Sequence, residues 1–122
     1  MINDALALIG RAFLAMLLVL GGFQKLGDAG PALGLLVGLG FPGWLIWPAL
    51  AFNLIAGAGI LLGIATRPLA LAAAAYCALT SIFHYLPDDP WQMTIFVKNW
   101  SLAGGFIMLA LNGPGRFALL NR

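Results

Sequence analysis

The sequence predicts an all-α membrane protein, a bundle of four transmembrane helices with a short interfacial helix between spans one and two. Hydrophobic residues make up 62% of the chain and charged residues only 8%, whereas a soluble domain carries roughly 25% charged residues. Four apolar segments are each long enough for the roughly 20 residues that a helix needs to cross a bilayer. The 122 residues therefore hold one transmembrane domain, residues 1–122, and leave no room for a soluble catalytic domain.

Composition also excludes several classes of function. A net charge of +2 is too small to indicate a nucleic-acid partner. The single cysteine, Cys77, excludes an internal disulfide, a CxxC redox pair and a cysteine-ligated cluster within one chain. The pattern contains no metal-ligand spacing, no nucleophile with a base and no phosphate-binding loop. We therefore expect no metal site and no covalently bound cofactor, and the sequence assigns no catalytic residue.

The first predicted span covers residues 4–25. Its polar and small side chains recur at helical spacing along one face, namely Arg11, Ala15, Leu18, Gly22 and Lys25. The segment that follows, residues 26–43, is too apolar for a simple loop and too short to cross a membrane. Proline suits a first helical turn, so we expect a short helix that starts at Pro31 and lies at the membrane surface.

The second predicted span covers residues 44–65. Trp44 begins it at an interface, where indole rings are enriched in membrane proteins. Asn53 and Gly57 share one face, and Gly59 with Gly63 forms a small-xxx-small pair, which lets two helix backbones approach closely in lipid. The span therefore predicts close contact with a neighbouring helix.

The third and fourth predicted spans cover residues 68–86 and 93–112, joined by a Pro- and Asp-rich connection. Each has one polar face. The third carries Cys77, Thr80, Ser81 and His84, and the fourth carries Lys98, Ser101, Gly105, Met108 and Asn112. Four such stripes facing inward make a bundle.

The charges predict the orientation of the chain. Cations favour cytoplasmic loops. One side of the predicted bundle holds the turn at Arg67 and the tail with Arg116 and Arg122, whereas Asp28, Asp88 and Asp89 lie on the other. We therefore expect both termini in the cytoplasm of a bacterial or archaeal cell, with the chain in its inner membrane.

Ionisable residues inside a span are costly and are functional candidates. Near the outer ends of the spans, five side chains are expected to meet as a ligand-binding site: Gln24, Lys25, His84, Lys98 and Asn99. Two cations, an imidazole and amides would fit a quinone head group, a lipid phosphate or a small oxyanion. The plainer interpretation is that the lysines extend to the lipid head groups and that the histidine is an ordinary interfacial residue.

Arg11 and Asn53 form the predicted structural pair. Arg11 lies about 10 Å inside the first span, and Asn53 lies about 13 Å from the interface at Trp44, at 1.5 Å per helical residue. These depths are similar, so the Arg11 guanidinium is expected to donate to the Asn53 amide and to hold spans one and two together.

Five stretches in order resemble the DoxX family. They are Arg11 followed by GGFQKL (residues 21–26), Phe41–Pro42 before span two, GAGILLGIATRPLAL (residues 57–71), His84 at the end of span three, and KNWSLAGGFIMLALNGPGRFAL (residues 98–119). The resemblance implies a small four-helix membrane protein. It also implies a setting of membrane redox complexes, since the family takes its name from a subunit associated with a thiosulfate:quinone oxidoreductase. Where many members carry a glutamate in span two, this chain has Asn53, which removes a carboxylate that would relay protons.

Three functions follow as hypotheses. The leading one is an accessory, quinone-interacting subunit of such a redox system, which would take part in catalysis only within a quinone-linked oxidoreductase complex. The second is a non-catalytic scaffold or assembly protein, and the third is a small dimeric exporter. The expected partners are the lipid bilayer, a quinone or small anionic ligand, and a redox protein or a second copy of the chain. The exporter ranks last because all four acidic residues lie at helix ends or in loops.

Overall fold

Helices form almost the whole of the structure, a computed structural model that describes residues 2–27 and 30–118, without the side chains of residues 25, 31 and 32. Asp28 and Arg122, used above to predict the orientation, lie outside the described residues. The helices follow in the order α1 (Ile2–Gly27), α2 (Gly30–Gly38), the 3-10 turn η1 (Gly43–Leu45), α3 (Ile46–Leu62), α4 (Thr66–Thr80), the 3-10 turn η2 (Ser81–His84) and α5 (Pro90–Asn112).

Four helical segments are long and apolar enough to cross a membrane: Ile2–Gln24, Gly43–Leu62, Thr66–His84 and Pro90–Asn112. Together with the absence of strands among the described residues, they confirm the predicted all-α membrane bundle. The short helix predicted between the first two spans is present as α2.

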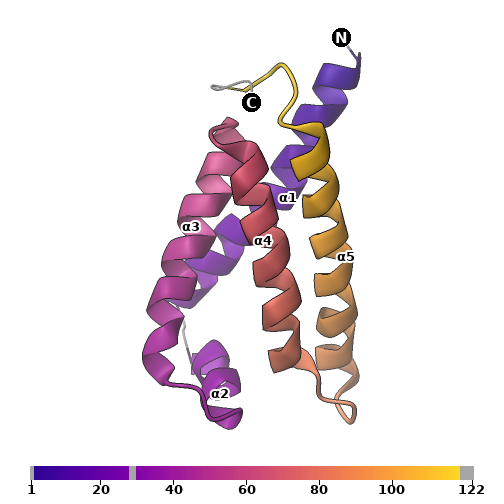
Figure 1. Ribbon diagram of the computed structural model, residues 1–122. Coiled ribbons are helices and arrows are strands. Elements are labelled where there is room, and N and C mark those ends of the chain that lie inside the picture. The colour runs from indigo at the N-terminus through magenta and orange to yellow at the C-terminus, as the bar shows by residue number, and fades with distance from the viewer. Residues whose placement is uncertain (1, 28–29, 119–122) are drawn as a thin grey trace.

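The long helices associate as two antiparallel pairs. α1 packs mainly against α3, and α4 packs mainly against α5 (Figure 1). Glycines allow the close approach of α1 and α3. A Cβ atom on Gly57 would lie 2.6 Å from Val19 Cγ2, and one on Gly22 would lie 2.6 Å from Leu54 Cδ2. In lipid, such close backbone contact replaces the hydrophobic effect as the force that holds helices together.

The two pairs meet at the end that carries both termini and diverge toward the other end, where α2 lies in the space between them (Figure 1). The sharp turn between α3 and α4 fixes the closed end. Gly63 and Ala65 both adopt left-handed backbone angles there, with φ of 77° and 50°. Only glycine takes the first conformation without a steric cost, so Gly63 sets how tightly the chain reverses.

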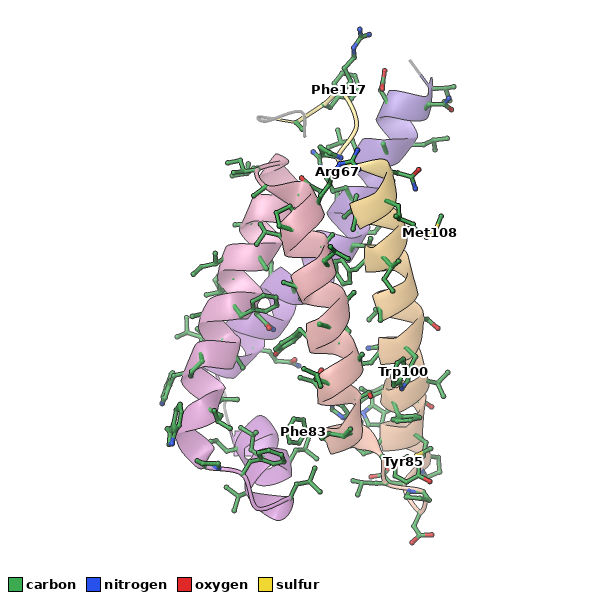
Figure 2. All side chains as sticks on the ribbon, viewed as in Figure 1. Arg67, Phe83, Tyr85, Trp100, Met108 and Phe117 are labelled. Carbon is green, nitrogen blue, oxygen red and sulfur yellow. The ribbon has the colours of Figure 1, made fainter. Side chains whose placement is uncertain are left out.

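Small side chains dominate the interior. Ala15, Ala56, Ala70 and Ala73 are fully buried, with Phe106 as the largest side chain among them. Large apolar side chains instead cover the outside, and Figure 2 shows Trp100 and Met108 pointing away from α5. An exterior of this kind suits contact with lipid chains.

We predict that Gly57→Leu lowers the free energy of unfolding by about 1–3 kcal/mol, because the new side chain must displace Val19. The melting temperature of the purified protein in detergent measures the effect. Gly104→Leu is the matched control, since a Cβ on Gly104 meets nothing within 4 Å. Equal melting temperatures for the two variants would contradict the close approach of α1 and α3.

Candidate functional site

A cavity of about 640 Å³ lies between the two helix pairs, toward the end where they diverge. Its walls come from every helix, and most of its lining is apolar: Leu17, Leu18, Leu35, Leu36, Phe41, Leu45, Ile46, Ile95 and others. Its polar lining consists of Gln24, Asn53, Tyr76, Thr80, His84, Gln92, Lys98 and Asn99. Apolar walls with a few convergent polar groups are typical of small-molecule sites, and the volume is in the usual range.

Asn53 and Tyr76 provide one polar group of the cavity. Asn53 lies on α3 and is only 3% exposed, and its side chain shares a hydrogen bond with Tyr76 on α4. The Tyr76 ring also packs against Phe52, with ring centroids 4.9 Å apart. A buried amide needs such a partner because an unsatisfied one costs free energy. The bond therefore fixes a polar edge within an apolar wall.

His84 and Gln92 provide a second polar group. Asp89 starts α5 by accepting hydrogen bonds from the backbone N–H groups of Trp91 and Gln92, as an N-cap does. Gln92 is thereby held in the first turn of α5, where its Oε1 lies 2.6 Å from His84 Nδ1. With that nitrogen bonded to an acceptor, Nδ1 carries the proton and Nε2 is left as the acceptor when the ring is neutral.

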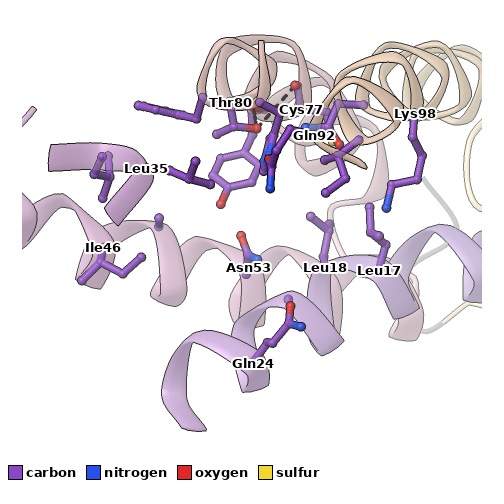
Figure 3. A pocket seen from close by; sticks show the side chains of 18 of the residues that line it. Leu17, Leu18, Gln24, Leu35, Ile46, Asn53, Cys77, Thr80, Gln92 and Lys98 are labelled. Atoms are coloured by element: carbon purple, nitrogen blue, oxygen red, sulfur yellow. Dashed lines mark hydrogen bonds between the residues drawn. The ribbon is translucent and has the colours of Figure 1, made fainter. Parts of the chain in front are cut away.

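Lys98 is the positively charged residue in the lining of the cavity. Its side chain extends from α5 toward Leu17 of α1 rather than along its own helix (Figure 3). Within the described chain, no Asp or Glu lines the cavity. The cavity therefore has positive character and offers strong hydrogen-bond donors.

The structure brings together four of the five residues predicted as the ligand site, since Gln24, His84, Lys98 and Asn99 all line the cavity. The side chain of the fifth, Lys25, lies outside the described part of the chain. Sequence reasoning missed Tyr76 and Gln92. Tyr76 stands alone at the end of an alanine run, and Gln92 lies in a segment taken for a connection. The strongest available signal was the Asp89–Pro90 dipeptide, which starts a helix before Gln92.

Arg11 lies at the closed end, and its predicted bond to Asn53 is wrong. Arg11 is 2% exposed. It donates to the carbonyl oxygens of Leu61 at 3.0 Å, Pro114 at 2.6 Å and Phe117 at 2.6 Å. Contacts of Gly22 with Leu54 fix the antiparallel register of α1 and α3. Arg11 therefore lies some 16 Å along α1 from the level of Asn53, at 1.5 Å per residue.

Helix ends explain how Arg11 is accommodated without a carboxylate. The carboxyl-terminal end of a helix carries unpaired carbonyls and a partial negative charge. Leu61 lies in the last turn of α3, and Pro114 follows the end of α5. Arg67 likewise donates to an unpaired carbonyl at the end of α5, that of Leu111, at 3.0 Å. The two arginines thus join the ends of α3 and α5 to α1 and α4.

We predict that Arg11→Leu lowers the free energy of unfolding by about 3 kcal/mol, because three carbonyls then lose a charged donor. Thermal unfolding in detergent measures the loss. Arg116→Leu removes the same charge from an exposed position nearby and is the control. A melting temperature of Arg11→Leu equal to that of the control would show that the bonds contribute nothing.

These features define a class of protein: a four-span helical membrane protein, fastened at one end by the buried Arg11 and the exposed Arg67, with a polar-edged cavity toward the other end. The DoxX family model matches residues 6–86. The chain belongs to the DoxX family.

Two relatives from Escherichia coli (strain K12) match over most of their length. The inner membrane protein YqjF is 28% identical over 119 residues, covering 97% of this chain and 92% of the relative. The inner membrane protein YphA is 32% identical over 133 aligned positions, covering 98% of this chain and 91% of the relative. No solved structure matches the chain significantly.

Proposed function

We propose that this DoxX protein is an accessory subunit of a membrane redox system and that its cavity binds the head group of a quinone. The observation that carries the proposal is the combination of a cavity of about 640 Å³, apolar walls and separate polar groups at Asn53–Tyr76, His84–Gln92 and Lys98. A quinone ring has two carbonyl acceptors on opposite edges and apolar faces, so it needs donors on different walls.

The chemistry of the lining supports a binding role more than a catalytic one. Quinone reduction consumes protons as well as electrons, and a protein that performs it alone needs acids near the ring. The described residues that line the cavity include one imidazole, that of His84, and no carboxylate. Electron and proton delivery is therefore assigned to a partner protein, while this chain holds and orients the ring.

The placement in the cell is part of the same proposal. Both matched relatives are named inner membrane proteins, and we assign this chain to the same kind of membrane. The start of α4, with Arg67, and the segment after α5, with Arg116, lie at the closed end. The segment between η2 and α5, with Asp88 and Asp89, lies at the other end (Figure 1). The excess of cations at the closed end supports cytoplasmic termini, so the cavity would be nearer the outer face.

We predict that a short-chain quinone binds the purified protein saturably and raises its melting temperature. Lys98→Ala and His84→Ala should each weaken binding about three- to tenfold, because each removes one hydrogen bond to the ligand or its neighbour. Native mass spectrometry of the detergent-solubilised protein measures the bound fraction.

Ser101→Ala is the control, since Ser101 lies on the same helix, is exposed and bonds only to the Val97 carbonyl of its own helix. Absence of quinone binding by the wild type would reject the proposal and favour a scaffold role, in which the cavity residues have no ligand. Weakening by Ser101→Ala equal to that by Lys98→Ala would show that the effect does not come from the cavity.

A further inference from the structure

We infer that the ligand is an amphiphile with a hydrocarbon chain and that it reaches the cavity sideways from the bilayer, through an opening between α1 and α5 at the level of Lys98. The inference rests on the cavity of the proposed function and narrows its ligand. Of the ligand classes that the polar residues fit, it selects a chain-bearing molecule over a small water-soluble oxyanion.

α1 and α5 make few contacts, and the glycine contacts between α1 and α5 or the segment after it lie toward the closed end. Leu14 of α1 lies against Gly105, and Ala7 lies against Gly115, just beyond α5. Toward the other end the two helices diverge, because α1 runs diagonally to join α3 (Figure 1). In an antiparallel pair, moving seven residues from Leu14 along α1 and seven back from Gly105 along α5 sets Gly21 opposite Lys98. At that level the two helices have diverged.

The exposure of Lys98 marks one part of the rim of the cavity. Lys98 lines the cavity and is exposed at the same time, and its side chain reaches toward Leu17 across the gap (Figure 3). A residue with both properties lies at the rim of the cavity. Other rim residues are Gln24, Phe41 and Trp91, and Lys98 marks the part of the rim that faces α1. Within the described residues, no acceptor bonds its ammonium group, so its donors remain available to a head group that passes or stops there.

The opening is at the depth of lipid chains. Lys98 lies about 12 Å from the start of α5 at Pro90, and Leu17 lies about 15 Å from the end of α1 at Gly27, at 1.5 Å per residue. Because the hydrocarbon core of a bilayer is about 30 Å thick, both residues fall well inside it. A gap there faces acyl chains and not water.

α2 and a pair of aromatic rings lie on the direct route from the membrane surface. α2 covers the wide end, with Leu35 and the buried Leu36 among the cavity walls. Beyond α2, Phe41 meets Phe83 of η2 edge to face, with centroids 5.4 Å apart. A ligand with a polar ring and a hydrocarbon chain therefore fits this geometry with the ring among Asn53, Tyr76 and Lys98 and the chain in the gap between α1 and α5.

Cys77 provides a built-in reporter of access. It is the only cysteine of the chain, lines the cavity and is 3% exposed. In vesicles containing the full chain, an N-alkylmaleimide that partitions into lipid should label Cys77, whereas a sulfonated maleimide confined to water should not. Cys77→Ala gives the background, and labelling after unfolding in detergent gives the total thiol.

Leu17→Trp tests the position of the opening. An indole at this rim position should slow labelling by the lipid-soluble reagent about tenfold, which corresponds to about 1.4 kcal/mol of added barrier. Met16→Trp is the matched control, because Met16 is the neighbouring residue on α1, is 52% exposed and does not line the cavity. Its labelling rate should equal that of the wild type.

Each alternative outcome overturns the inference. Faster labelling by the sulfonated reagent means that the cavity opens to water. Because maleimides react with the thiolate, labelling only after unfolding, at neutral and at alkaline pH alike, means that the cavity is closed. Equal rates in Leu17→Trp and Met16→Trp mean that access lies elsewhere. The experiment contains no quinone, so a sideways opening found in a protein that binds no quinone would reject the proposed function and leave the inference standing.

Discussion

The burial of one cation determines how this bundle is arranged. Arg11 has no carboxylate partner among the described residues, and its hydrogen bonds run to three backbone carbonyls on segments distant in the sequence. Each of those carbonyls belongs to the end of α3 or to the segment after α5, where backbone acceptors are left over. A buried charge and unpaired backbone carbonyls are each unfavourable in lipid. The hydrogen bonds between the Arg11 guanidinium and these carbonyls satisfy both. This arrangement requires both helices to end at the level of Arg11, which brings both helix pairs together there.

Among the described residues, no arginine makes a comparable set of bonds at the opposite end. The polar residues there are spread over several walls. His84 bonds to Gln92 within the α4–α5 pair, whereas Asn53 of α3 bonds to Tyr76 of α4 and joins the two pairs at mid-length. Beyond the level of that bond the pairs diverge, and α2 and the side chains of the cavity fill the space between them. Closed packing of small residues in one half and an open volume in the other are therefore two results of the same distribution of polar groups along the spans.

The sequence predicted the architecture well, because hydrophobic length and Gly/Pro punctuation determine where helices begin and end. It also placed Gln24, His84, Lys98 and Asn99 at one level. It failed for Arg11, because depth alone cannot give the acceptor: hydropathy describes side chains, and the acceptors of Arg11 are backbone carbonyls made available by helix ends. Of the polar face predicted for span three, Cys77, Thr80 and His84 line the cavity, while the Thr80 and Ser81 hydroxyls donate to backbone carbonyls of the same span. The sequence could not identify Tyr76 as a site residue, because its role depends on its hydrogen bond to Asn53 on another helix.

The divergence of the helix pairs also has a mechanical consequence. A bundle held at one end behaves as two levers with a common pivot, here the arginine-bridged ends of α3 and α5. Rotation of one pair by about 5° about that pivot displaces the far ends of helices some 30 Å long by roughly 2–3 Å, which is close to the thickness of a flat ring. Small adjustments beside Arg11, such as a partner protein pressing on the segment after α5, would therefore be amplified into a change in the width of the cavity.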